Sequence, residues 1–165
     1  MSLALSQVAK QENASVFVIS NTNTGKCIGP RLSVNLDASY ISNVIETPSE
    51  SSPVTIKKKA FSGKAFEIAQ TNSSSCVLAL SPNAYTIKNN PNPNCQIDTF
   101  DFTSECSDVT SEKIEKLTGK ISLAEAEVVV SAGRGLKGPE NWGIIEELAD
   151  ILDAGTACSK PVSDI

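Results

Sequence analysis

Residues 126–154, AEVVVSAGRGLKGPENWGIIEELADILDA, constrain the fold of this chain more than any other stretch. The unbroken run Val128–Val130 is typical of a parallel strand that is buried on both faces. Pro139 suits the first turn of a helix, and Gly155 suits the end of one. Between them, apolar residues recur at helical spacing: Ile144, Ile145, Leu148, Ile151 and Leu152. The stretch therefore predicts a strand, a tight turn and an amphipathic helix.

The turn fits the pattern G-x-G-x-x-G at Gly133, Gly135 and Gly138, in which glycines let a ligand approach the backbone closely. Free N–H groups at the start of the helix would then face an anion. Because the pattern follows a predicted strand and precedes a predicted helix, it favours a dinucleotide-binding loop. The alternative is an ordinary tight turn between a strand and a helix.

The residues around the turn bear on which dinucleotide it would hold. An NAD-binding unit needs an acidic residue at the end of its second strand, about 20 residues further on. The nearest acid, Asp153, belongs to the predicted helix, and the next strand candidate, residues 156–159, ends before a lysine. Arg134 places a fixed cation in the turn, which fits better a flavin adenine dinucleotide held partly by an arginine–phosphate contact.

Composition excludes several other classes of function. The chain has 165 residues, a net charge of −5 and no histidine, so the usual general base, metal ligand and nucleophile partner are missing. Nucleic acids and anionic membranes require clustered cations, and the one basic cluster, Lys57–Lys59, is expected on a solvated strand edge. Five scattered cysteines indicate neither a disulfide framework nor a zinc site. No apolar run reaches the ~20 residues of a membrane span.

The first 106 residues are predicted to form a sheet-rich α/β domain. A helix at the start leads to a strand at Val16–Ser20, and a polar loop leads to a helix at about Gly29–Leu36, with Pro30 in its first turn. The loop contains Thr24-Gly25-Lys26, which fits only part of a phosphate-loop pattern and is interpreted as plain structure. Further strands are expected at residues 40–46, 54–60, 64–69, 76–80 and around 97–102.

A change in composition divides the chain. Residues 88–96, KNNPNPNCQ, predict a loop because asparagine and proline sustain neither helix nor sheet. Residues 107–123 are charged and carry few apolar side chains, so they are interpreted as a linker between domains. The second domain then covers residues 124–165.

Read as a whole, VVVSAGRGLKGPENWGIIEELADILDAGTACSKPVSDI resembles the start of the flavin domain in the α subunit of electron transfer flavoproteins. In that family a VVSGGRGL-x-x-x-ENF stretch precedes a helix and a GASRAAVD-like segment. SNTNTGKCIGPRLSVNLDASYISNVIE is similar to the family's STFGKNLLPRVAALLDVAPISDVIE region. The resemblance implies an incomplete three-layer α/β N-terminal domain (1–106), followed by the first β-α-β piece of a Rossmann-like FAD-binding domain (124–165).

The resemblance also implies a function, that of a redox carrier rather than an enzyme. The intact subunit would bind FAD and pair with an electron transfer flavoprotein β subunit. It would accept electrons from acyl-CoA dehydrogenases, as in fatty acid β-oxidation, and pass them to a quinone oxidoreductase. The location would be the bacterial cytoplasm or the mitochondrial matrix. The fragment alone is expected to bind FAD poorly, since one loop supplies only part of a cofactor pocket, and its free sheet edges favour self-association.

Four residues are carried over as cofactor-binding, and none as catalytic or metal-binding. Arg134 and Gly135 match the loop that contacts the cofactor, while Ser159 and Lys160 match a Ser-Arg pair that lies near FAD. Lys160 keeps the positive charge but loses the planar guanidinium group, and the alternative for it is a solvated lysine at a strand end. Two other interpretations of the chain stay open: a truncated NAD-type dehydrogenase and a cofactor-free interaction module.

Overall fold

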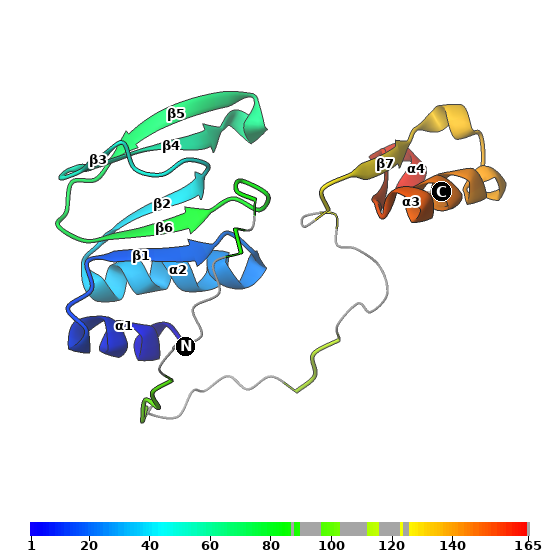
Figure 1. Cartoon of the computed structure of the whole chain (residues 1–165). Helices are drawn as coiled ribbons and strands as arrows, with labels where there is room; N and C mark the ends of the chain where they lie inside the picture. The colour runs from blue at the N-terminus through cyan, green and yellow to red at the C-terminus, as the bar shows by residue number, and fades with distance from the viewer. Residues whose placement is uncertain (87, 90–96, 103–111, 116–122, 124–125, 165) are drawn as a thin grey trace. The chain divides into compact units, whose positions relative to one another are not determined.

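The computed structural model of the chain describes residues 1–86, 88–89, 97–102, 112–115, 123 and 126–164. The chain separates into two compact units, Met1–Ser107 and Asp108–Ile165, and both mix helices with strands (Figure 1). The mixed α/β class predicted from the sequence is therefore confirmed. No helix in the described ranges is both long and apolar enough to cross a lipid bilayer.

The first unit is built on a six-stranded sheet in the order β1-β6-β2-β4-β3, with β5 beside β4. The strands β1, β6 and β2 run parallel, and β4 is antiparallel to β2, β3 and β5. Helix α2 packs on the parallel strands and helix α1 packs on α2 (Figure 1). The elements are α1 (Ser2–Gln11), β1 (Val16–Ser20), α2 (Asn23–Leu36), β2 (Ser39–Val44), β3 (Glu50–Ser51), β4 (Val54–Ala60), a 3-10 turn η1 (Phe61–Gly63), β5 (Ala65–Gln70) and β6 (Cys76–Leu80).

The core of this unit is centred on β6. Its residues alternate between the two faces of the sheet, as in any strand, yet Cys76 through Ala79 are all buried, so both faces are covered. One face forms a cluster with apolar residues from β2 and β4: Ile41, Val44, Val54, Ile56, Cys76 and Leu78. The strands predicted at 54–60 and 76–80 occur at those residues, because turn-forming residues flank each apolar run.

Helix α2 starts at Asn23, not at about Gly29, so the predicted loop ahead of it was wrong. The polar residues that favour a loop are the cap of the helix, because the Thr22 hydroxyl accepts a hydrogen bond from the Gly25 N–H at 3.3 Å. Gly25 is buried, and a Cβ there would overlap the carbonyl oxygen of Ser20. Thr24-Gly25-Lys26 is therefore a helical turn packed closely on β1, and Pro30 lies inside the helix rather than in its first turn.

Two further predictions for the first unit were wrong. The lysines of β4 do not lie on an edge, since β4 runs between β2 and β5; Lys57 pairs with Glu46 at 2.7 Å, and its ammonium lies 4.8 Å from the centre of the Phe66 ring. Residues 97–102 form no strand, and Ile97 is 88% exposed. Alternating apolar residues make a strand only where another strand pairs with them. The loop predicted at 88–96 falls largely outside the described residues.

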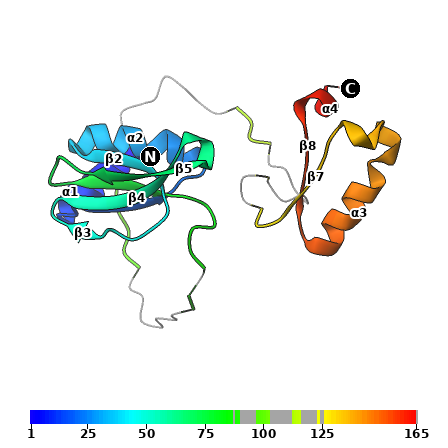
Figure 2. The same ribbon diagram turned by 90° about the horizontal axis from the view of Figure 1, so that it is seen from above.

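The second unit is a β-α-β arrangement, as predicted. Strands β7 (Val129–Ala132) and β8 (Gly155–Cys158) pair in parallel, and α3 (Gly143–Leu152) lies alongside them (Figure 2). Two 3-10 turns, η2 (Arg134–Leu136) and η3 (Pro139–Asn141), precede α3, and the short helix α4 (Lys160–Ser163) follows β8.

Details of this unit differ from the sequence prediction. Val128 and Val129 are 45% and 43% exposed, so β7 is not buried on both faces in a sheet of two strands. Pro139 begins η3 instead of the α-helix. Helix α3 ends at Leu152. The next residue, Asp153, caps it in the left-handed conformation with φ 50°, and Gly155 is the buried first residue of β8. An aspartate can take this conformation, although glycine is the usual choice.

Candidate functional site

The connection between β7 and α3 is a compact loop that satisfies much of its own backbone. The N–H groups of Leu136, Lys137 and Gly138 donate to carbonyl oxygens within the loop at 3.0 to 3.1 Å. The N–H groups of Arg134 and Gly135 donate to no backbone carbonyl in the part of the chain that the structure describes. Among the described residues, no backbone carbonyl therefore competes with a ligand for these two groups.

Two glycines of the loop, Gly133 and Gly135, do not serve the turn itself, whereas at Gly138 a Cβ would overlap the Glu140 carboxylate. The left-handed residue is Lys137, with φ 70°, while Gly133 is extended at φ −118°. A Cβ added to Gly133 or Gly135 would meet nothing within 4 Å. Neither the backbone conformation nor the packing of the described residues requires glycine at these two positions. Open space beside glycine is what a closely approaching ligand needs.

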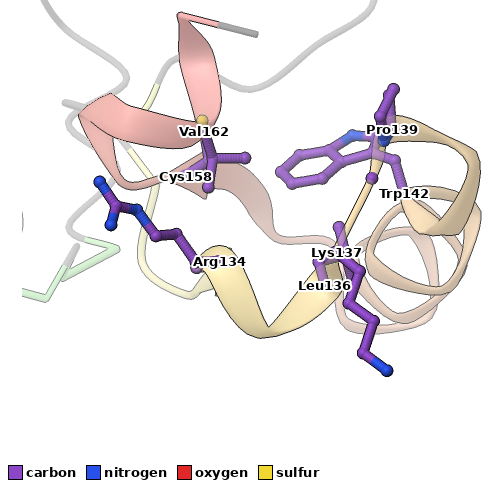
Figure 3. Close-up of a pocket in the computed structure, with 9 residues that line it drawn as sticks. Arg134, Leu136, Lys137, Pro139, Trp142, Cys158 and Val162 are labelled. Carbon is purple, nitrogen blue, oxygen red and sulfur yellow. The ribbon is translucent and has the colours of Figure 1, made fainter.

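A cavity of about 460 Å³ opens beside this loop. Figure 3 shows the indole ring of Trp142 and the side chain of Val162 facing one another across it, whereas the side chains of Arg134 and Lys137 extend away from this gap. The cavity lies where β7 and β8 end, at the carboxyl ends of parallel strands, which is where ligands bind in α/β sheets. Its lining residues are Gly133, Arg134, Leu136, Lys137, Gly138, Pro139, Trp142, Cys158 and Val162.

Of the four residues predicted from sequence, only Arg134 is in this lining. Gly135 lies in the same 3-10 turn. Ser159 and Lys160 lie along the chain between two lining residues, Cys158 and Val162. The N–H of Ser159 donates to the carbonyl of Ala132 at 3.2 Å, and its own carbonyl accepts from Val162 at 2.8 Å, so it joins the strand ends to α4. That the four predicted residues contact a cofactor remains a prediction.

Sequence reasoning missed most of the apolar lining. Trp142 is the only tryptophan of the chain and directly precedes the amphipathic helix, a position that could have marked it. No sequence pattern marked Val162 and Cys158 as cavity residues, because they reach the cavity only through the pairing of β8 with β7.

The groups around the cavity fit a nucleotide cofactor with a planar ring. They comprise apolar side chains, two N–H groups available to a ligand and the Arg134 guanidinium, which forms no ion pair among the described residues. The described residues contain no cluster of His, Cys, Asp and Glu that could hold a metal ion. A β-α-β unit with a glycine-containing turn and a cavity at its strand ends defines the class of α/β proteins that bind nucleotide cofactors.

Comparison with known proteins identifies the family within this class. Residues 1–105 match the electron transfer flavoprotein domain, and residues 122–165 match the electron transfer flavoprotein FAD-binding domain. The chain belongs to the electron transfer flavoprotein family, as the sequence resemblance predicted.

Several relatives are named as the alpha subunit. The chain is 27% identical, over 95% of its length, to the electron transfer flavoprotein subunit alpha of Bacillus subtilis. It is 30% identical, over 94% of its length, to a probable mitochondrial subunit alpha of Caenorhabditis elegans. It covers 49% and 46% of these two relatives, so it spans about half of their length. Electron transfer flavoproteins are redox carriers rather than enzymes.

Proposed function

We propose that this chain contributes the first β-α-β part of the FAD site of an electron transfer flavoprotein. One observation carries the proposal. Gly133 and Gly135 face open space, and the N–H groups of Arg134 and Gly135 donate to no backbone carbonyl among the described residues. Nothing in the described part of the second unit explains these glycines, whereas close approach of a cofactor does. FAD, when bound, supplies the chemistry of accepting and releasing electrons.

Within this proposal each predicted residue has a role. The Arg134 guanidinium and the N–H of Gly135 donate hydrogen bonds to anionic or carbonyl groups of the cofactor. Ser159 fixes the end of β8 through its hydrogen bond to Ala132 and presents its hydroxyl group there. Lys160 is exposed and supplies a positive charge that favours a reduced, anionic cofactor.

The proposal extends to partners and location. Its partners are an electron transfer flavoprotein β subunit, acyl-CoA dehydrogenases as electron donors and a quinone oxidoreductase as acceptor, in the bacterial cytoplasm or the mitochondrial matrix. Support comes from the family and from relatives named in a bacterium and as mitochondrial. Exposed aliphatic residues of α3 also favour burial against further protein: Ile144, Leu148, Ile151 and Leu152.

The proposed domain limits are 1–106 and 124–165, joined by a linker at 107–123. Two observations support them. The family matches end at residue 105 and resume at residue 122, and the compact units divide at Ser107 and Asp108.

The test is a visible absorption spectrum with FAD titration. It compares the chain alone with a version extended beyond Ile165 by the corresponding part of the Bacillus subtilis relative and co-expressed with a β subunit. Flavin bands are expected in the extended complex, and weak or no binding in the chain alone. Absence of flavin from both would contradict the proposal and favour a cofactor-free interaction module.

The variant Arg134→Ala identifies the site within that complex. We expect it to weaken FAD binding by about tenfold or more, since a charge-assisted hydrogen bond is lost. Arg31→Ala is the matched control, because Arg31 is an exposed arginine of α2 in the first unit. Equal FAD affinity in both variants would contradict the assignment of Arg134. Hydride exchange with NADH would instead support a dehydrogenase.

A further inference from the structure

The cavity of the second unit is poorly suited to a diphosphate. A diphosphate-binding loop turns several free N–H groups toward its ligand, but here the N–H groups of Leu136, Lys137 and Gly138 are used within the loop. The side chains around the cavity are mainly carbon: Leu136, Pro139, Trp142, Cys158 and Val162. An anion placed among these apolar side chains would lose hydration there, and the side chains of the two lining cations, Arg134 and Lys137, extend away from this gap (Figure 3).

The same cavity suits a flat ring. The indole of Trp142 and the side chain of Val162 face one another across it, and the cations Arg134 and Lys137 extend away from this gap (Figure 3). An aromatic ring on one side and an aliphatic side chain on the other are apolar surroundings that suit a planar heterocycle. The cavity volume of about 460 Å³ is within the usual range for pockets that bind small molecules.

We propose that this cavity holds the isoalloxazine ring of the cofactor, with Trp142 as one wall and Val162 as the other. The diphosphate then lies outside the cavity. This inference rests on the proposed function, because it names the part of FAD that the unit receives. It assigns Trp142 as a residue that contacts the ring and sets the specificity of the cavity for flat heterocycles.

The single tryptophan makes the inference directly measurable on the full chain. Uniform ¹⁵N labelling gives one indole N–H signal in an NMR spectrum, and this signal detects even weak binding. Riboflavin and FMN carry a planar ring, whereas inorganic pyrophosphate is a diphosphate without any ring. We expect FMN at millimolar concentration, and riboflavin up to its solubility limit, to shift the Trp142 signal, and inorganic pyrophosphate to leave it in place.

Two exposed cysteines give a second readout. Cys158 lines the cavity, and Cys27 lies in α2 of the first unit as a matched control. FMN is expected to slow alkylation of Cys158 but not of Cys27. Trp142→Leu should weaken this protection by about tenfold, and Trp142→Phe, which keeps an aromatic ring, should restore most of it. Circular dichroism establishes that both variants fold.

The outcomes separate this inference from the proposed function. If inorganic pyrophosphate shifts the Trp142 signal as strongly as FMN, the cavity binds phosphate groups and the inference is wrong, while FAD binding by the extended complex can still hold. If no ligand shifts the signal although the extended complex contains flavin, the inference is again wrong and the function stands. If the extended complex also lacks flavin, both fail.

Discussion

At the scale of single residues, replacing glycine with alanine should lower the stability at one position and leave it nearly unchanged at another. Gly25→Ala places a Cβ against the carbonyl oxygen of Ser20, so helix α2 must move away from β1, at a cost of roughly 1–3 kcal/mol. Gly133→Ala meets nothing within 4 Å and should change the free energy of unfolding by less than about 0.5 kcal/mol. Urea unfolding followed by circular dichroism measures both. A large loss of stability in Gly133→Ala would mean that the chain itself requires this glycine.

The described cysteines should differ in reactivity. Cys76 is 1% exposed, and burial raises the pKa of its thiol, whereas Cys27 and Cys158 are exposed. Because the thiolate is the reactive form, iodoacetamide should label Cys27 and Cys158 in the folded chain, and Cys76 only after unfolding. Peptide mapping by mass spectrometry distinguishes the three sites. Early labelling of Cys76 would show that β6 opens readily.

At the scale of elements, α2 carries a proline in its interior. Pro30 has no N–H to donate to the helix, and its ring crowds the carbonyl group four residues earlier. Since Pro30 is exposed, Pro30→Ala should raise the free energy of unfolding by roughly 1 kcal/mol or more. The midpoint of urea unfolding measures this, with Pro82→Ala in the turn after β6 as a variant outside any helix. A lower midpoint for Pro30→Ala would mean that a bend in α2 is needed for its packing against α1.

The elements also show how far sequence patterns predict structure. Strands β1 and β6 follow from short apolar runs and β4 from β-branched residues, each bounded by turn-forming residues that leave no room for a helix. The start of α2 was missed because the side chain of Thr22 caps a helix as readily as it forms a loop. Arg134 was found from the glycine pattern, whereas Trp142 and Val162 were not, since their meeting depends on how β7 and β8 pair.

At the scale of the whole molecule, the buried apolar residues are distributed unevenly. Ten of the eleven buried apolar residues among those described belong to the first unit, and only Ala149 to the second. Stability scales with the apolar area removed from water. The described part of the second unit has little such area, and its α3 leaves large aliphatic side chains exposed. The two units should therefore differ in stability.

Hydrogen exchange monitored by mass spectrometry tests this difference. Amides of β6 should exchange most slowly, since this strand pairs on both sides and is buried on both faces. Amides of α3, β7 and β8 should exchange on the order of 100-fold faster or more, because local opening of the second unit exposes little additional apolar surface. In the extended complex with FAD, protection of β7 and β8 should rise, since a ligand that binds only the folded unit stabilises it. Protection of β6 serves as the internal control and should not change. Equal protection of both units in the chain alone would contradict the expected difference in stability.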